Sequence, residues 1–457
     1  MRHGPVPGAG DGWWAAQAGR RGVQDANATD FGPDGFGRPT VYIEMVKITN
    51  IRCFEDVTVD LRSPQGPKKL AVVIGDNGAG KTTLLRAIAM GLCDKDSTSA
   101  LLRDTTGKLI RDGQEEATIH VDLRAGAKRY GITTTFAKSG AGFEIVRKQE
   151  TKPSTDFPWR KIFVCGYGTD RGTQGAEDTE RYSAADAVYT LFSYDSALLN
   201  PEVVLWRRTE GKKAQIRKIC KAMDQILMLP PGSTRLDREG LRVSDTRRFV
   251  AGVGAMADGY AGTLAWVLDL LGWWYVAHPK AVRSPEGIVL IDELEQHLHP
   301  RWQREIICRF HDQFPGVQLV ATTHSPLCAA STPHIGSASA LLLLDQSKAG
   351  PVELVDDLPP IAGLRSDQVL ASRVFGYIIE GDVGTEELLR EVSILAGKGD
   401  ARTTVEDERY ARLRGTLKSV IIRDRRTAIE ESIEAELDAA GRKRIKELEK
   451  SLFRRKP

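Results

Sequence analysis

Polar and apolar residues alternate along much of the early part of the chain. The alternation begins near Val41 and runs through MVKITNIRCFEDVTVDL. A period of two is typical of half-buried antiparallel strands. Further strands, several with the same alternation, are predicted at 70–74, 117–124, 128–136, 143–148 and 162–166. The pattern therefore predicts an N-terminal part that is rich in antiparallel strands.

The pattern becomes helical near residue 183. The region from about 183 to 228 is predicted to be helical, and Pro230 and Pro231 end it. After it, helices at 262–275 and 300–313 alternate with apolar, β-branched strands at 287–292 and 317–322. This alternation is typical of an α/β protein with buried strands.

The C-terminal part is expected to be helical from about residue 365 onward. Its last stretch, 404–453, is highly charged and carries Leu and Ile at steps of three and four residues. The favoured interpretation is a solvated helical hairpin, and the alternative is an arm that binds a partner or faces DNA.

Composition narrows the class of protein but does not identify a function. A chain of 457 residues is long enough for two domains, or for one large core with appended segments. Hydrophobic residues make up 41%, and no run of eighteen apolar residues occurs, so no membrane span is expected. The formal net charge is only +3, so binding to nucleic acid would require a local basic patch.

The cysteines and the N-terminus indicate the compartment. Six cysteines are scattered singly without a CxxC pair, and the first 40 residues lack the apolar core of a signal peptide. We therefore expect a cytoplasmic protein with reduced thiols. Residues 1–40, rich in Gly, Ala, Pro and Asp, are predicted to be a disordered tail, and Met45 marks another place where a compact domain could begin.

A phosphate-binding loop is predicted where the apolar run LAVVI meets GDNGAGKTT. Gly75, Gly80, Lys81 and Thr82 match the pattern GxxxxGK[ST], and the amphipathic stretch TTLLRAIAMGL follows. Glycines let successive N–H groups point at phosphate oxygens, and the next helix offers its positive N-terminal end. Lys81 would reach the β and γ phosphates of ATP, and the Thr82 hydroxyl would hold Mg²⁺. The predicted nucleotide-binding residues of this segment are Gly75, Asp76, Asn77, Gly78, Ala79, Gly80, Lys81, Thr82 and Thr83.

Two later strands end in groups that could complete such a site. The strand IVLIDE, at 288–293, places Asp292 for a water-mediated contact to Mg²⁺ and Glu293 to orient or deprotonate the attacking water. The strand QLVATTHSP, at 318–326, places His324 where it could reach a γ phosphate. The alternatives are a buried strand with a solvated acidic end and a structural histidine. The phosphate loop upstream favours the catalytic interpretation.

The phosphate loop, IDE, HLHP at 297–300 and TTHSP, in this order, resemble the ATP-binding-cassette ATPases of the SMC, RecF and overcoming-lysogenization-defect type. The resemblance covers roughly 45–345. It implies an α/β head that joins an antiparallel β lobe to a phosphate-loop parallel sheet, with two heads enclosing two ATP molecules. We therefore predict a head at 41–350 with a helical lobe inserted at about 180–275, and a helical C-terminal extension at 351–457.

The resemblance also implies a signature segment, which matches MADGYAG at 256–262. Gly259 is retained and is predicted to contact nucleotide, but Ala257 stands where the family usually has a hydroxyl residue. Alanine cannot donate the hydrogen bond that a hydroxyl would make. Such a bond contributes about 1 kcal/mol between neutral groups and more to a phosphate, so activation by a partner head is in doubt. Leu294, where related chains often have Pro, puts little chemistry in question.

The segment GYGTDRGTQG, at 166–175, resembles the tyrosine-glycine-arginine segment of the same family. Arg171 or Gln174 could therefore sense the nucleotide, although an ordinary surface loop is the favoured interpretation.

A second family motif is interpreted as a coincidence. IIEGDVGTEELL, at 378–389, resembles the start of a Toprim nuclease, with Glu380 as a metal ligand. A Toprim site also needs a later DxD pair, whereas Asp407 and Asp424 are isolated in helical sequence, so a turn that enters a helix is favoured. The C-terminal part looks more like that of Toprim-free relatives, such as ATPase subunits of Septu-type phage-defence systems.

The resulting hypothesis is a slow ATPase whose bound ATP holds a dimer or larger assembly that acts on DNA, in phage defence with a separate nuclease partner or in repair. DNA is inferred from the resemblance, because the basic clusters at 423–426, 441–444 and 453–457 are balanced by nearby acids. A transporter subunit is one alternative, which the lack of an LSGGQ form disfavours. A nucleotide-dependent switch or scaffold with little turnover is another, and Ala257 keeps it open.

Overall fold

The structure is a computed structural model of the chain. Its described residues are mainly 40–103, 109–139, 142–150, 162–171, 181–193, 201–237, 240–244, 250–252, 258–280, 284–332, 338–346, 350–356 and 405–413, with isolated residues between 179 and 403. Of 142–150, 201–203, 240, 250–252 and 258–261 only the backbone is described.

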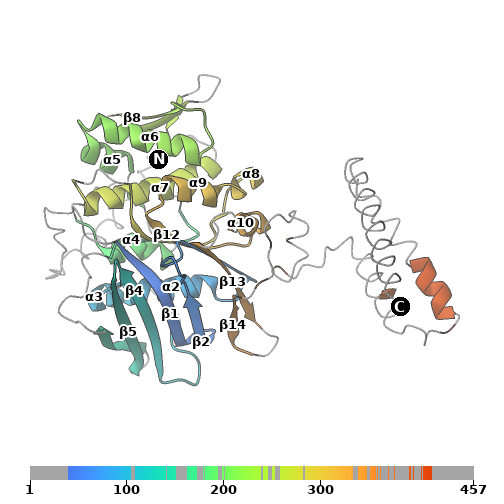
Figure 1. Cartoon of the computed structure of the whole chain (residues 1–457). Coiled ribbons are helices and arrows are strands. Elements are labelled where there is room, and N and C mark those ends of the chain that lie inside the picture. Colours follow the sequence, from blue (N-terminus) through green and yellow to red (C-terminus); the bar gives the residue numbers. More distant parts are fainter. Residues whose placement is uncertain are drawn as a thin grey trace, which may run out of the picture. The chain divides into compact units, whose positions relative to one another are not determined.

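The chain divides into two compact units, Met1–Gly376 and Tyr377–Pro457. The predicted tail at 1–40, apart from Thr40, and most of the predicted C-terminal extension lie outside the described residues, as do Glu380 and Asp424. Asp407 lies in a described helical stretch at 405–413. The proposed division into head and extension stays a prediction, and the following paragraphs concern the first unit (Figure 1).

A five-stranded antiparallel sheet holds the first part of the chain, in the order β2-β1-β4-β5-β6. The strands are β1 (Val41–Ile51), β2 (Phe54–Asp60), β4 (Glu116–Ala125), β5 (Lys128–Ser139) and β6 (Gly142–Glu150). Buried and less buried positions alternate along β4, as the sequence predicts, and its buried face packs on α2 (Lys81–Leu92). Each fully buried Val, Ile or Leu on this face contributes roughly 1.5–3 kcal/mol.

The first alternating stretch, predicted as continuous, is a hairpin. A turn between Ile51 and Phe54 separates β1 from β2, and Asn50 and Arg52 on either side of Ile51 have positive φ angles of 56° and 47°. The alternation of buried and exposed side chains continues after the turn, so it does not indicate that the chain reverses direction there.

The second sheet has six strands in the order β14-β13-β3-β12-β11-β7. They are β3 (Leu70–Gly75), β7 (Val164–Tyr167), β11 (Gly287–Ile291), β12 (Val317–Thr322), β13 (Ser339–Gln346) and β14 (Val352–Val355). All neighbouring pairs run parallel except β13 with β14. The central strands are buried on both faces, which explains their uninterrupted apolar sequences.

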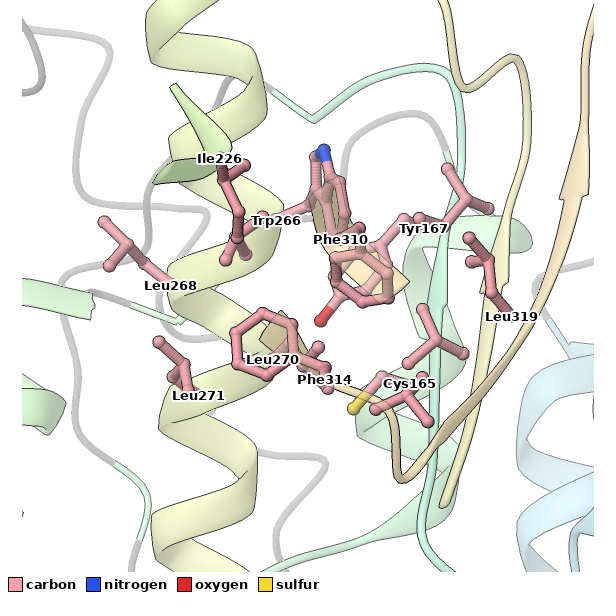
Figure 2. Close-up of a cluster of buried hydrophobic side chains, with 14 of the residues drawn as sticks. Cys165, Tyr167, Ile226, Trp266, Leu268, Leu270, Leu271, Phe310, Phe314 and Leu319 are labelled. Atoms are coloured by element: carbon pink, nitrogen blue, oxygen red, sulfur yellow. The ribbon is translucent and has the colours of Figure 1, made fainter. Parts of the chain in front are cut away.

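Helices cover both faces of the six-stranded sheet. On one face, α2 lies between the two sheets, as Figure 1 shows. On the other face, α7 (Asp258–Ala277) and α9 (Ile306–Gln313) form an aromatic cluster with β7 (Figure 2). The ring centroids of Trp266 and Phe310 are 5.1 Å apart, and those of Trp266 and Tyr167 are 5.9 Å apart. No helix among the described residues is long and apolar enough to cross a membrane.

A buried glutamine joins the two sheets. β2 ends its pairing with β1 at Met45, so Ile43 has no strand partner on that side. The side chain of Gln318, fully buried at the start of β12, fills the gap: its Oε1 accepts from the Ile43 N–H at 2.7 Å and its Nε2 donates to the Ile43 carbonyl at 2.9 Å. A buried amide with all these groups satisfied fixes how the sheets meet.

The lobe predicted to be helical also contains strands. Its helices are α4 (Ala184–Val188), α5 (Pro201–Thr209) and α6 (Lys213–Ile226), with a 3₁₀ turn, η4 (Tyr189–Leu191). A three-stranded antiparallel sheet follows, made of β8 (Thr234–Asp237), β9 (Gly240–Ser244) and β10 (Val250–Gly252). These strands are too short to show a clear period, which is why the sequence pattern misses them.

Three further helices complete the described part of this unit. They are α3 (Lys95–Arg103), α8 (Pro300–Gln303) and α10 (Pro326–Ser331). The single helix predicted at 300–313 is therefore two helices, because the chain turns between α8 and α9.

Candidate functional site

The phosphate loop lies between β3 and α2. Its backbone conformation and close packing require glycine at several positions. Gly75, Gly78 and Gly80 have φ angles of 153°, 83° and 92°, which L side chains rarely adopt. A Cβ at Gly75 would lie 2.6 Å from the Leu344 carbonyl oxygen, and one at Gly80 would lie 2.5 Å from the Cys53 sulfur. Both positions therefore exclude any other residue, and α2 begins immediately afterwards at Lys81.

The Lys81 side chain bonds back to the backbone of the phosphate loop. Its Nζ donates to the carbonyl oxygens of Gly75 at 2.7 Å and Asp76 at 2.9 Å. Burial lowers the pKa of Lys81, and the carboxylates of Asp292 and Glu293 oppose that shift. The ammonium is thus held beside the loop backbone, where it could exchange these carbonyls for phosphate oxygens.

Asp292 connects four elements at one sheet edge. Its Oδ2 accepts from the Thr82 hydroxyl of α2 at 2.5 Å, and its Oδ1 accepts from the Thr322 hydroxyl of β12 at 2.5 Å. Its own N–H donates to the Tyr167 carbonyl, at the end of β7, at 2.8 Å. The residue is only 2% exposed, so the carboxylate is fixed in direction before any ligand arrives.

The chain turns sharply at Glu293, directly after Asp292. The φ angle of Glu293 is 47°, a conformation that is uncommon outside glycine. Its N–H donates to the Thr322 hydroxyl at 2.8 Å, and its carbonyl accepts from Arg171 at 2.5 Å. Its backbone is therefore held on two sides, and the residue is half-buried.

Arg171 is the main support of this turn. Its Nη2 donates to the carbonyl oxygens of Asp292 at 2.7 Å and Glu293 at 2.5 Å, and the residue is only 7% exposed. Burial lowers the pKa of Arg171 to about 10, with Asp292 the strongest opposing charge, so it stays a cation at neutral pH. The interpretation as an ordinary surface loop is wrong for Arg171, and Gln174 lies outside the described residues.

Glu295 organises the end of β12 and was missed by sequence reasoning. Its Oε2 accepts from the Thr323 hydroxyl at 2.6 Å, and its Oε1 accepts from the His324 N–H at 2.5 Å. Ser325 then caps α10 by accepting from the N–H groups of Leu327 and Cys328. The only signal in the sequence was a third acid two residues after Glu293, in IDELE.

The predicted catalytic and metal-binding side chains therefore come together. Thr82 and Asp292 are in direct contact, and Asp292 and Glu293 lie close enough to Lys81 to oppose the lowering of its pKa. His324 is half-buried at the end of the adjacent strand. Strands β3, β11 and β12 are parallel neighbours, so their carboxyl ends, and the groups that follow them, share one edge.

The departure at Leu294 has a structural reason. Its N–H donates to the Thr322 carbonyl at 2.9 Å, which a proline could not do. The signature segment is only partly described: Met256 and Ala257 lie outside the described residues, whereas Gly259 lies in the first turn of α7. The helix thus begins at Asp258 and not at residue 262.

The donor set fits a nucleotide with a hard cation. The Thr82 hydroxyl and the Asp292 carboxylate offer the oxygen ligands that Mg²⁺ prefers. The carboxylates of Asp292, Glu293 and Glu295 all lie close enough to influence the pKa of Lys81, and a divalent cation would balance this excess of negative charge. The glycine-shaped loop leads into a helix N-terminus, which suits a polyphosphate.

Comparisons with known proteins agree with this geometry. A family model described as "AAA domain" matches residues 45–162, and a second AAA-domain model, whose description also names AbiEii toxin and a type IV TA system, matches 261–330. The resemblance to SMC- and RecF-type ATPases that the sequence motifs indicate is confirmed. The two matches contain the phosphate loop and the acidic strand, respectively.

Two curated proteins are similar to this chain over longer stretches. The chain is 25% identical to "Septu protein PtuA" of Bacillus mycoides over 73% of this chain and 45% of that protein, so the match spans less than half of the relative. It is 22% identical to "Retron Ec83 probable ATPase" of Escherichia coli over 62% of this chain and 68% of that protein.

Among solved structures, the SMC head domain from Thermotoga maritima aligns with a TM-score of 0.41 and 11% identity. The alignment covers 69% of this chain and 98% of that one.

Proposed function

We propose that the chain binds Mg²⁺-ATP at the carboxyl edge of the six-stranded sheet and hydrolyses it to ADP and phosphate. The observation that carries this proposal is the 2.5 Å hydrogen bond from Thr82, which follows Lys81 in the first turn of α2, to Asp292, which directly follows β11. Residues 210 positions apart in the sequence are brought into direct contact there.

The roles follow from the positions of the side chains. Lys81 offers its ammonium to phosphate oxygens, and the loop N–H groups surround them. Thr82 and Asp292 would hold Mg²⁺, which would supply positive charge to offset that of the transferred phosphoryl group. Glu293, held by Arg171 and Thr322 through its backbone only, keeps its carboxylate available to accept a proton from the attacking water. His324 donates to the γ phosphate.

The support of Glu293 matters for the rate. A general base must lie within hydrogen-bond reach of the water, and small displacements are costly. The turn at Glu293 is held by one donor, Arg171, and one acceptor, Thr322, so the backbone that carries the base is fixed before ATP binds.

We further propose that ATP holds two or more copies together and that the assembly acts on DNA in phage defence with a separate nuclease, or in repair. The similarity to a Septu PtuA protein and to a retron ATPase supports the defence setting. A 31% identical stretch of 99 residues in the Rad50 double-strand break repair ATPase of Methanopyrus kandleri supports the alternative of repair.

A nucleotide-dependent switch with little turnover is the second candidate, because Ala257 removes a hydroxyl donor from the predicted signature segment. It predicts tight ATP binding with turnover that neither DNA nor a partner stimulates.

Asp292→Asn tests the proposal against a matched control. The amide weakens Mg²⁺ binding and cannot accept from both hydroxyls as the carboxylate does, so we expect Mg²⁺-dependent phosphate release to fall by on the order of 100-fold or more. Asp345→Asn makes the same change at an exposed position near the end of β13, in the same sheet, and should leave turnover unchanged. Equal turnover in both variants would contradict the assignment of Asp292.

A further inference from the structure

A concentration of positive charge lies on α5 and α6. Seven basic residues and a single acidic one, Glu210, lie between positions 207 and 221. The formal net charge of the whole chain is only +3, so this short segment is more basic than the chain as a whole. In Figure 1, α6 lies at the end of the unit away from the antiparallel sheet.

Four of these basic residues already interact with other groups of the chain. Arg208 donates to the Thr179 carbonyl at 2.9 Å, and Lys212 donates to the carbonyls of Arg208 at 3.0 Å and Pro279 at 3.1 Å. Arg207 and Lys218 also interact with other groups. The remaining three, Lys213, Arg217 and Lys221, form what we call the α6 row.

The α6 row lies on one side of the helix. Its members are spaced four residues apart, about 6 Å along the axis per step, so the row is about 12 Å long. All three are exposed, while Ile219, Met223 and Ile226 of the same helix are buried. Packing of the buried side against α9 and β8 holds the row in place.

No carboxylate among the described residues forms an ion pair with the α6 row. The Arg217 Nε makes only a 3.4 Å contact to the Lys213 carbonyl in its own helix. Two exposed lysines of the antiparallel sheet differ: Lys47 pairs with Asp56 at 3.0 Å and Lys138 with Glu115 at 2.7 Å. The charge of the row is therefore available to an external anion.

We propose that the α6 row binds the phosphate backbone of duplex DNA. Duplex DNA carries one negative charge per about 1.7 Å of axis, so a 12 Å length of duplex carries roughly seven phosphates, of which the three cations of the row can neutralise up to three. This inference rests on the proposed action on DNA, but not on ATP hydrolysis.

The composition of α6 favours duplex DNA over single-stranded nucleic acid and over a protein partner. The helix contains no aromatic residue, whereas binding of single strands commonly uses aromatic side chains on which bases stack. Its exposed positions are Lys, Arg, Ala and Gln, without the large apolar or aromatic anchor at the centre of most protein interfaces.

The test measures binding of a fluorescent 40-base-pair duplex at several salt concentrations, with the full chain and the triple variant K213Q/R217Q/K221Q. Gln has a helix propensity close to that of Lys and Arg, so α6 should stay folded, which circular dichroism checks. Each phosphate contact contributes about 0.9 to the slope of log affinity against log salt. We expect the slope to fall by roughly 2 to 3 and the affinity at 0.1 M salt to fall on the order of 100-fold.

The matched control is K95Q/R103Q/K280Q, which removes the same charge from exposed positions elsewhere. It should retain nearly the wild-type slope, and turnover without DNA should be unchanged in both variants. If the wild-type chain binds the duplex and the α6 variant binds it equally well, the inference fails while the proposed action on DNA stands. If the wild-type chain binds no duplex, both fail. Tighter binding of single strands, or equal competition by polyglutamate, would also overturn the assignment to duplex DNA.

Discussion

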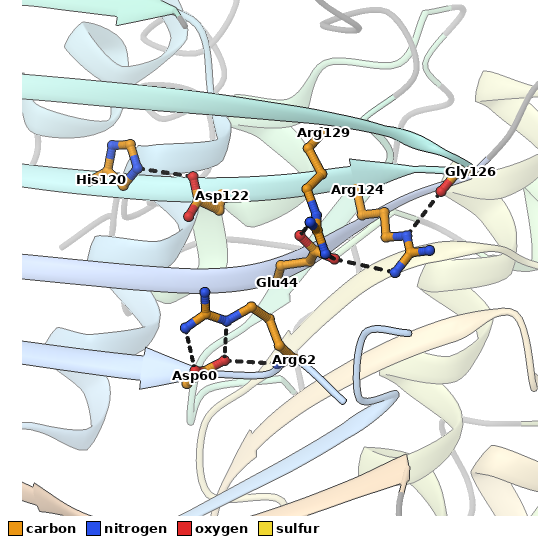
Figure 3. Close-up of polar contacts among 8 residues, drawn as sticks. All are labelled: Glu44, Asp60, Arg62, His120, Asp122, Arg124, Gly126 and Arg129. Carbon is orange, nitrogen blue, oxygen red and sulfur yellow. Dashed lines mark hydrogen bonds and ion pairs between the residues drawn. The ribbon is translucent and has the colours of Figure 1, made fainter. Parts of the chain in front are cut away.

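The two sheets use polar side chains in opposite ways. At the carboxyl edge of the six-stranded sheet, Asp292 and Arg171 are 2% and 7% exposed. Asp292 bonds to groups of α2 and β12, and Arg171 bonds to two carbonyl oxygens of the turn after β11. On the antiparallel sheet, charged pairs lie at the surface: Arg62 and Asp60 are 2.5 Å apart with side chains 52% and 41% exposed (Figure 3). Water competes with the second kind of contact and is excluded from the first.

Glu44, on the antiparallel sheet, is intermediate between the buried and the exposed contacts. Its side chain is 4% exposed and pairs with Arg129 at 2.7 Å and Arg124 at 3.5 Å, as Figure 3 shows. Its partners are 68% and 36% exposed, so water still reaches the cations. Burial of the whole network, and not of one member, therefore separates the candidate site from the surface pairs of the antiparallel sheet.

Outside the proposed ATP site, the strongest test of this contrast is Asp269, on α7. This fully buried carboxyl accepts from the Tyr167 hydroxyl at 2.9 Å and from the Leu199 N–H at 2.7 Å. Burial raises its pKa from 3.8 to about 7. The folded chain therefore binds the proton of this carboxyl more tightly than the unfolded chain does. The contribution of this proton to the free energy of unfolding is complete below about pH 4 and is lost as the pH rises through about 7.

We therefore expect Asp269→Asn to unfold with less dependence on pH than the wild-type chain. The amide keeps the shape but cannot ionise, so the loss of a few kcal/mol of wild-type stability between pH 5 and pH 8 should largely disappear. Urea unfolding at both pH values measures it, with Asp345→Asn as the exposed control. Parallel pH profiles for wild type and Asp269→Asn would show that the carboxyl is not buried as described.

Arg171→Ala should give the next largest effect. Two buried carbonyl oxygens would lose their donor, at a cost of about 1–3 kcal/mol in stability. Because Arg171 contacts backbone and positions Glu293, kcat should fall roughly tenfold or more, with little change in KM for ATP.

Arg171→Lys restores one charged donor and should recover part of kcat. The outcome against this account is a higher KM with an unchanged kcat, since that pattern would mean that Arg171 contacts the nucleotide directly.

Lys138→Ala should give the smallest effect. The pair with Glu115 is 2.7 Å long, but the two side chains are 43% and 80% exposed. Such pairs contribute about 0–1 kcal/mol, so thermal unfolding should change little and turnover not at all. A loss as large as that of Arg171→Ala would break the distinction between the two sheets.

The core of the candidate site was predictable because its signals are local. GDNGAGKTT, IVLIDE and TTHSP each place a functional group directly after an apolar strand, and parallel strands bring such ends to one edge. The positions of Lys81, Asp292 and His324 at that edge therefore follow from short stretches of sequence.

The supporting residues could not be predicted in the same way. Arg171 acts on carbonyls 121 and 122 residues away, and Gln318 replaces a strand partner for Ile43 across 275 residues. Neither partner is a side chain, so no complementary residue type marks the pairing. The short strands β8 to β10 and the turn between β1 and β2 were missed because tertiary pairing, and not local period, defines them.

The central claim is that Glu293 is the base of an ATP-hydrolysing site built at the edge of the six-stranded sheet. The most direct measurement is the identity of the nucleotide that Glu293→Gln retains after incubation with Mg²⁺-ATP and gel filtration. The amide keeps the size of the side chain but cannot accept the proton, so we predict retained, unhydrolysed ATP in a larger assembly, and turnover lowered by about 100-fold or more. Turnover at the wild-type rate, with ADP as the bound nucleotide, would contradict the account.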